Sequence, residues 1–224
     1  MKKILLCLFA LTMSAVIEAQ TISNEQLDKI TKADGTVSWS KKAKKLAKDV
    51  QLSDGTLQLV DVVYHQLDKK EAYNRIRKLA IQEFGATSLI DETDGFSFKC
   101  TISNLCSRSI VESVYTFNIQ PILRFDFKEG RMRFVFTLRY YDVEETTSPY
   151  VANFGSFVVV GGAIPSSATS WAIKDCAPFV HYGSHPTGAA SKAFVYTLAC
   201  RQIILDRVKQ IIYQKAEGNL SDDW

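Results

Sequence analysis

After its first 20 residues, the chain has neither a long apolar segment nor a strong excess of one charge. A membrane-spanning helix needs about 18 or more consecutive apolar residues, so we expect no transmembrane anchor. The 27 basic side chains are nearly balanced by 24 acidic ones. Such a balance gives no general attraction to polyanions, and we expect no nucleic-acid partner.

The familiar catalytic signatures are also missing from the sequence. It contains no glycine-rich phosphate loop, no Gly-x-Ser-x-Gly elbow and no His-Glu-x-x-His zinc motif. The cysteine spacing fits no standard zinc pattern, and we expect neither a metal nor a cofactor. These absences disfavour the well-known enzyme classes and favour a protein that binds without catalysis.

The N-terminus has the pattern of an export signal. Two lysines at positions 2 and 3 precede the apolar run from residue 4 to residue 16, and a small residue, Ala19, follows. A basic start, a short apolar run and a small-residue cleavage site are typical of a secretory signal peptide. We therefore expect a signal peptide over residues 1–19 and a soluble mature protein in the periplasm or outside the cell.

The strongest structural pattern lies between residues 115 and 141. Apolar and polar residues alternate on both sides of Glu129-Gly130, and the apolar parity changes from odd to even across that pair. Strict alternation around a glycine turn predicts an antiparallel hairpin with one buried face. For apolar residues to lie opposite each other in the hairpin, the residue numbers of each pair must sum to 259, as in Phe127 with Met132. Pro121 cannot donate to a ladder, so a bulge or unpaired stretch is expected there.

A capped amphipathic helix is predicted over residues 69–84. Asp68 is a candidate N-cap, Glu71 lies three residues later in a capping-box arrangement, and Gly85 ends the pattern. The apolar residues recur at the helical period; they are Ala72, Tyr73, Ile76, Leu79, Ala80 and Phe84. Residues 56–64 before this helix are rich in β-branched side chains and predict a strand covered on both faces or close to the sheet centre.

Together these segments predict an α+β fold of the order β-α-β-β-β-β, an antiparallel meander packed by an amphipathic helix. Apolar residues at helical spacing add a long C-terminal helix over residues 188–218. We expect one domain over residues 56–224, with a loop-rich insertion at about residues 143–188. Residues 20–55 form a weakly patterned N-terminal segment with one short basic helix.

That basic helix, residues 39–50, carries five lysines around a thin apolar stripe. A basic amphipathic helix can bind anionic lipid or nucleic acid. Here the apolar face is narrow, and no arginine or additional aromatic residue accompanies the lysines. We therefore interpret it as a short packing helix with a solvated lysine face.

The region from Val62 to Asp142 resembles a secreted bacterial family, of Bacteroidetes type, that has a TATA-binding-protein-like fold and no known function. The resemblance is carried by the helix start, the first central strand and the turn with the strand that follows it: Asp68, Lys69, Ala72 and Tyr73; residues 115–119; and Lys128-Glu129-Gly130-Arg131 through Tyr141. It implies this fold and an exported location. It implies no activity, because fold alone does not define function.

The richest reactive stretch, residues 174–185, contains Cys176, His181 and His185. A thiol with a histidine base could act as a nucleophile, so a Cys/His-dependent hydrolase or transferase is one alternative. The two histidines with Asp175 could also be interpreted as metal ligands. Neither interpretation has a third signature element, and we favour a structural cysteine beside two ordinary surface histidines.

Four cysteines remain after signal-peptide removal: Cys100, Cys106, Cys176 and Cys200. An even number in an oxidising compartment permits disulfides, with three possible connectivities. A core of this size can also form without covalent links, so four buried thiols are an equal alternative.

The leading functional hypothesis is an exported, non-catalytic binding module. Residues 154–164 are apolar and glycine-rich, and more aromatic residues lie nearby. The candidate binding residues are Tyr150, Phe154, Phe157 and Trp171, and the expected partner is an envelope protein, a glycan or a small apolar ligand. A structural or assembly component of the envelope is a further alternative.

Overall fold

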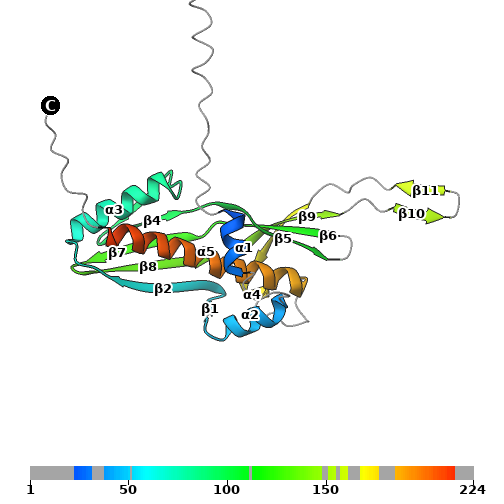
Figure 1. Ribbon diagram of the computed structural model, residues 1–224, viewed down its shortest axis with the longest axis horizontal. Coiled ribbons are helices and arrows are strands. Elements are labelled where there is room, and N and C mark those ends of the chain that lie inside the picture. Colours follow the sequence, from blue (N-terminus) through cyan, green and yellow to red (C-terminus); the bar gives the residue numbers. More distant parts are fainter. Residues whose placement is uncertain are drawn as a thin grey trace, which may run out of the picture.

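The computed structural model describes residues 23–31, 38–50, 52–110, 113–147, 151–154, 157–160, 167–176 and 185–214 (Figure 1). Within these ranges no helix is long and apolar enough to cross a membrane. The signal peptide predicted over residues 1–19 lies outside the described residues and stays a prediction.

The helices are α1 (Asn24–Thr31), α2 (Trp39–Ala47), α3 (Lys69–Gln82), α4 (Ile173–Cys176) and α5 (Thr187–Tyr213). The strands up to the central turn are β1 (Leu52–Ser53), β2 (Thr56–Tyr64), β3 (Ile90–Glu92), β4 (Gly95–Lys99), β5 (Ile102–Ile110), β6 (Ser113–Ile119) and β7 (Ile122–Lys128). The later strands are β8 (Arg131–Leu138), β9 (Tyr140–Thr147), β10 (Val151–Phe154), β11 (Phe157–Val160) and β12 (Ser167–Ala172).

The strands form two larger antiparallel sheets. The six-stranded sheet has the order β1-β2-β8-β7-β4-β3, the four-stranded sheet has the order β12-β9-β6-β5, and β10 pairs with β11. One or two residues separate β4 from β5, β6 from β7 and β8 from β9. The predicted α+β class with antiparallel pairing is confirmed, but the expected single meander is divided, because the chain passes directly from one sheet to the other at these three places.

The register predicted for the central hairpin is confirmed in the six-stranded sheet. Phe127 pairs with Met132 and Phe125 with Phe134, and the turn residue Gly130 has φ +69°. A positive φ is accessible to glycine at little cost, which is why this residue suits a two-residue turn. The alternating pattern was sufficient here because a one-residue slip would expose a whole row of phenylalanines.

In the four-stranded sheet the predicted register is wrong by one residue. The residue numbers of paired positions in β6 and β9 sum to 260 and not to 259, as in Phe117 with Val143. Between the two registers, three residues on one strand, Leu138 to Tyr140, lie opposite two on the other, Gln120 and Pro121. An extra residue on one strand is a β-bulge, and it reverses which side chains face inward. Hence Tyr141 is fully buried, whereas Tyr140, predicted to face the core, is 37% exposed.

Helix α3 begins as predicted, with the Asp68 carboxylate accepting a hydrogen bond from the Glu71 backbone N–H at 2.7 Å. The Glu71 carboxylate does not complete a reciprocal capping box. It accepts a hydrogen bond from Arg75 at 2.5 Å, a side-chain pair one helical turn apart. Gly85, with φ +63°, follows the helix end as the sequence predicts.

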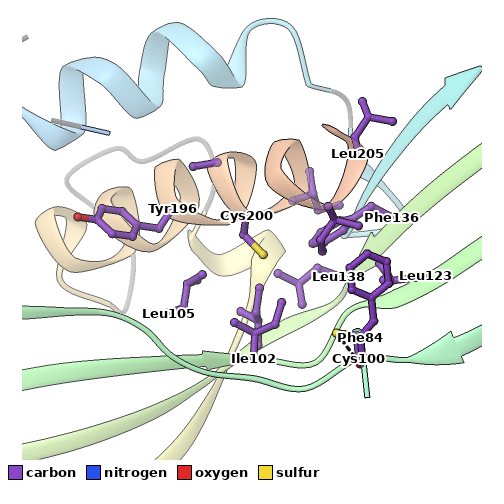
Figure 2. Packing of buried hydrophobic residues seen from close by; sticks show 14 of the residues in the cluster. Phe84, Cys100, Ile102, Leu105, Leu123, Phe136, Leu138, Tyr196, Cys200 and Leu205 are labelled. Carbon is purple, nitrogen blue, oxygen red and sulfur yellow. Dashed lines mark hydrogen bonds between the residues drawn. The ribbon is translucent and has the colours of Figure 1, made fainter. Parts of the chain in front are cut away.

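Helices α3 and α5 pack against each other and over one face of the strands. Figure 2 shows side chains from β5, β7 and β8 pointing toward α5; the labelled ones are Ile102, Leu105, Leu123, Phe136 and Leu138. On the helix side, the Cys200 side chain points toward these strands, and Leu205 is also buried. The predicted long C-terminal helix is thus the main cover of the core.

The N-terminal segment is more structured than the sequence predicts. Helix α1 packs against α5, with Leu27 buried and the Tyr196 hydroxyl donating to the Asp28 carboxylate at 2.5 Å. Helix α2 also packs on α5, placing the Trp39 ring 5.6 Å from that of Tyr196. Most lysines of α2 are exposed, which fits the interpretation of a packing helix with a solvated face.

Residues 143–188, predicted to be loop-rich, contain regular structure in the part that is described. Strand β9 continues to Thr147, β10 and β11 form a hairpin, and β12 adds an edge to the four-stranded sheet. Residues Ser167 to Ser170 of β12 are all exposed. A stretch of edge strand without buried side chains needs no apolar alternation, so these four residues carry no strand signal in the sequence.

Candidate binding site on the uncovered sheet face

In the described part of the chain, the face of the six-stranded sheet opposite α3 and α5 carries exposed side chains, among them Val62 and Tyr64. Directly paired residues of antiparallel strands point to the same face, so the register identifies the side chains that share it. Nearest the β7–β8 turn, Tyr64 pairs with Arg131, and Arg131 pairs with Lys128. We call this surface the open face.

Two further rows cross the open face behind the first. In one, Val62 lies beside Arg133, which lies beside Asp126. The other is longer; from β2 to β3 it contains Val60, Val135, Arg124, Ser97 and Ile90. These rows mix cationic, anionic and apolar side chains on four neighbouring strands and the edge strand β3.

A hollow of about 690 Å³ occupies the part of the open face nearest the turn. Its lining comes from β2, from the β3–β4 turn and from β7 and β8, and includes Val62, Tyr64, Asp94 and Met132. A volume of this size falls within the range of roughly 300–1,000 Å³ that is common for small-molecule sites. We refer to it as the pocket.

Ion pairs hold the centre of the pocket in place. Arg124 contacts Glu92 at 2.7 Å and Asp126 at 2.9 Å, while Arg133 contacts Asp126 at 2.7 Å. The hydrogen bond with Asp126 is the main reason that the pKa of Arg124 is raised. Exposed ion pairs contribute little stability individually, but this network fixes the direction of two guanidinium groups.

At the rim, Asp94 in the β3–β4 turn accepts a hydrogen bond from Lys69 at 2.7 Å. That bond, followed by the positive charge of Lys69 and a smaller contribution from Lys128, lowers the pKa of the Asp94 carboxyl group. Asp94 is therefore ionised at neutral pH and already engaged by a residue of α3.

The open face also gathers exposed apolar side chains. Tyr64 is 67% exposed, and the other large exposed hydrophobic residues of this face are Val60, Val62, Ile90 and Ile122. Residues 56–64 were predicted to be covered on both faces or close to the sheet centre. Neither holds, because the even-numbered side chains of β2 from Val60 to Tyr64 are exposed and β2 lies next to the short edge strand β1. Apolar groups concentrated on one exposed surface are typical of interaction sites.

The sequence-based binding residues lie elsewhere. Trp171 is only 5% exposed, and its ring lies 5.5 Å from Tyr115 and 5.3 Å from Phe117. It is a core residue and not part of an exposed surface. Tyr150 and the side chains of Phe154 and Phe157 lie outside what the structure describes, so their proposed role stays a prediction.

The geometry does not favour a Cys/His nucleophile at Cys176. Burial, with a smaller effect of the Asp175 charge, raises the pKa of the Cys176 thiol to about 12. A thiol with so high a pKa is protonated at neutral pH and reacts poorly. His185 stacks on Trp171 with ring centroids 4.2 Å apart, and burial lowers its pKa. His181 lies outside the described residues.

The four cysteines for which disulfides were one of two alternatives are free thiols, and each is buried. Burial raises the pKa of the Cys100 thiol to about 11. It is also the largest cause of the raised pKa of the Cys106 thiol, which is about 12. The Cys100 thiol donates to the Phe84 carbonyl at 3.7 Å (Figure 2). Of the two alternatives for these residues, the structure has thiols and not disulfides. Among the described residues, no cluster of three potential ligands could hold a metal ion.

The described chain is an α+β protein of antiparallel sheets with a long C-terminal helix on one face. Among solved structures, it is similar to a TBP-like protein from Parabacteroides distasonis ATCC 8503, with a TM-score of 0.46 and 11% sequence identity. The match covers 72% of this chain and 97% of the other. No protein-family model matches the chain, and neither does any curated protein.

Proposed function

We propose that this protein is an exported, non-catalytic binding module whose ligand occupies the open face. The observation that carries the proposal is the pocket, where ion-paired arginines lie beside the exposed Val62 and Tyr64. Ligand sites commonly combine apolar surface with a few fixed polar groups. The opposite face of the same sheet is filled by core side chains and by α3 and α5, which leaves the open face for a partner.

A chemical-shift titration of the full chain tests this role. A library of oligosaccharides and small apolar compounds, both neutral and anionic, is expected to yield ligands that perturb backbone amides of β2, β7 and β8. Tyr64→Ala should lower the affinity for each such ligand by about fivefold or more, because an exposed aromatic ring supplies much of the contact area.

The matched control is Ile81→Ala, since Ile81 is also exposed but lies on α3, at a separate hollow of about 330 Å³. Affinity should be unchanged in this variant. Ligands that perturb α3 and weaken only in Ile81→Ala would contradict the proposal, as would a library without any ligand for the open face.

Export is the second part of the proposal and is supported by the N-terminal pattern of the sequence. When the full chain is expressed in a Gram-negative host, the mature protein is expected to begin at Gln20 and to collect in the periplasmic or secreted fraction. N-terminal sequencing of that fraction checks the cleavage site. An uncleaved chain confined to the cytoplasm would refute an exported role while leaving the open face as a binding surface.

A further inference from the structure

Two cations stand side by side at the turn end of the pocket. Lys128 and Arg131 are direct cross-strand partners on either side of Glu129-Gly130, and both are exposed. Like charges placed directly opposite each other destabilise a β-ladder. Within the described ranges neither side chain takes part in an ion pair, and Lys128 contributes only a small, longer-range attraction to Asp94.

The acidic groups of the pocket cannot supply that compensation, because each is already engaged. Glu92 pairs with Arg124, Asp126 with Arg124 and Arg133, and Asp94 with Lys69. The ion-paired network is thus close to neutral in itself. What remains is a local surplus of positive charge at Lys128 and Arg131, on a chain that is otherwise nearly balanced.

Apolar surface adjoins this surplus. Tyr64 pairs directly with Arg131 across β2 and β8, and Val62 is the next residue along β2 that points into the pocket. A ligand that places an anion between the two cations would therefore extend its remaining atoms over an aromatic ring and an aliphatic side chain.

We propose that the pocket takes a small anionic ligand that joins a carboxylate or phosphate group to a ring or short apolar moiety. Its oxygen atoms lie between Lys128 and Arg131, and its apolar part lies on Tyr64 and Val62. Lysine provides a compact charge and arginine a planar set of donors, and both bind such oxyanions well. This inference rests on the proposed function, because it specifies the ligand of the same site.

Isothermal titration of the full chain with four probes tests it: phenyl phosphate, benzoate, inorganic phosphate and phenol. Phenyl phosphate or benzoate is expected to bind at least about tenfold more tightly than both inorganic phosphate and phenol, because only the first two carry both recognised parts. The affinity should fall as salt is raised. Comparison of phenyl phosphate with benzoate identifies which anion the pocket prefers.

The double variant Lys128→Gln/Arg131→Gln should lower the affinity for the preferred probe about tenfold or more. Its matched control is Lys41→Gln/Lys45→Gln, which removes the same charge from two exposed lysines of α2. The control should stay within about twofold of wild type. A Tyr64→Ala variant should bring the affinity of phenyl phosphate close to that of inorganic phosphate.

Equal weakening in both double variants would show non-specific charge attraction and overturn the inference. Equal affinity for phenol and phenyl phosphate, or no binding of either anionic ring compound at millimolar concentration, would also overturn it. Neutral ligands that bind the open face under those conditions would leave the proposed function intact, so the two failures can be told apart.

Discussion

Gly95→Ala is expected to destabilise the protein by about 3 kcal/mol or more, because the new methyl group has no room. A Cβ atom at this position would overlap the Phe125 carbonyl oxygen and lie 2.9 Å from the Asp126 Cα. Both neighbours are backbone atoms of the paired strand β7, so no side-chain rotation relieves the clash. Strands β4 and β7 would have to separate.

Urea denaturation followed by circular dichroism measures this loss. Gly188→Ala is the matched control, since its Cβ would lie 3.8 Å from the Ile110 Cδ1 in the first turn of α5, an ordinary contact distance. That variant should keep or slightly raise the free energy of unfolding, as alanine favours helix over glycine. An unfolding midpoint for Gly95→Ala equal to wild type would mean that the two strands are further apart than described.

Phe96→Ala is expected to lower the free energy of unfolding by ~3–5 kcal/mol, the usual cost of emptying a buried aromatic site. The Phe96 ring is fully buried and lies within 6.3 Å, between centroids, of four other rings. These rings belong to Tyr73 of α3, Phe98 of β4, and Phe125 and Phe127 of β7. The cavity would therefore weaken the contact between α3 and the sheet.

The same denaturation experiment compares Phe96→Ala with Ile90→Ala. Ile90 lies on the neighbouring strand β3 but is exposed, so its truncation should change stability by less than ~0.5 kcal/mol. Similar effects of the two substitutions would contradict the described core. Phe96→Leu should recover much of the loss, because leucine refills part of the site.

The central hairpin was predictable because its two faces differ sharply in polarity. Each inward position of β7 and β8 is apolar, and only one register satisfies all of them. The bulge beside Pro121 was predictable as an irregularity but not as a one-residue shift. Sequence marks the residue that cannot donate, whereas the extra residue lies on the opposite strand around Arg139.

The open face was not predicted, although its residues are among the most regularly spaced in the chain. Val60, Val62 and Tyr64 have the composition of a buried strand, and an apolar side chain looks the same in sequence whether a partner or the core covers it. The hairpin register does place Asp126 beside Arg133, but the remaining charged contacts depend on strands outside the hairpin, such as that of Arg124 with Glu92. Sequence spacing alone cannot bring those residues together.

Helix α1 escaped prediction for the opposite reason. Its buried surface consists mainly of Leu27 and Thr31, too few residues to establish a helical period. Its position depends on contacts with α5, which begins more than 150 residues later. Short helices of this kind are stabilised by tertiary packing and not by their own sequence.

The ion-paired network of the open face has a consequence for the energetics of recognition. Arg124, Arg133 and Asp126 project from paired strands and restrain one another before any ligand arrives. Side chains that are already ordered lose little conformational entropy on binding, and pre-organisation of this kind increases affinity without adding contacts. A small ligand could then bind to a nearly rigid surface, so its residence time would depend on the contacts themselves and not on the closing of a loop.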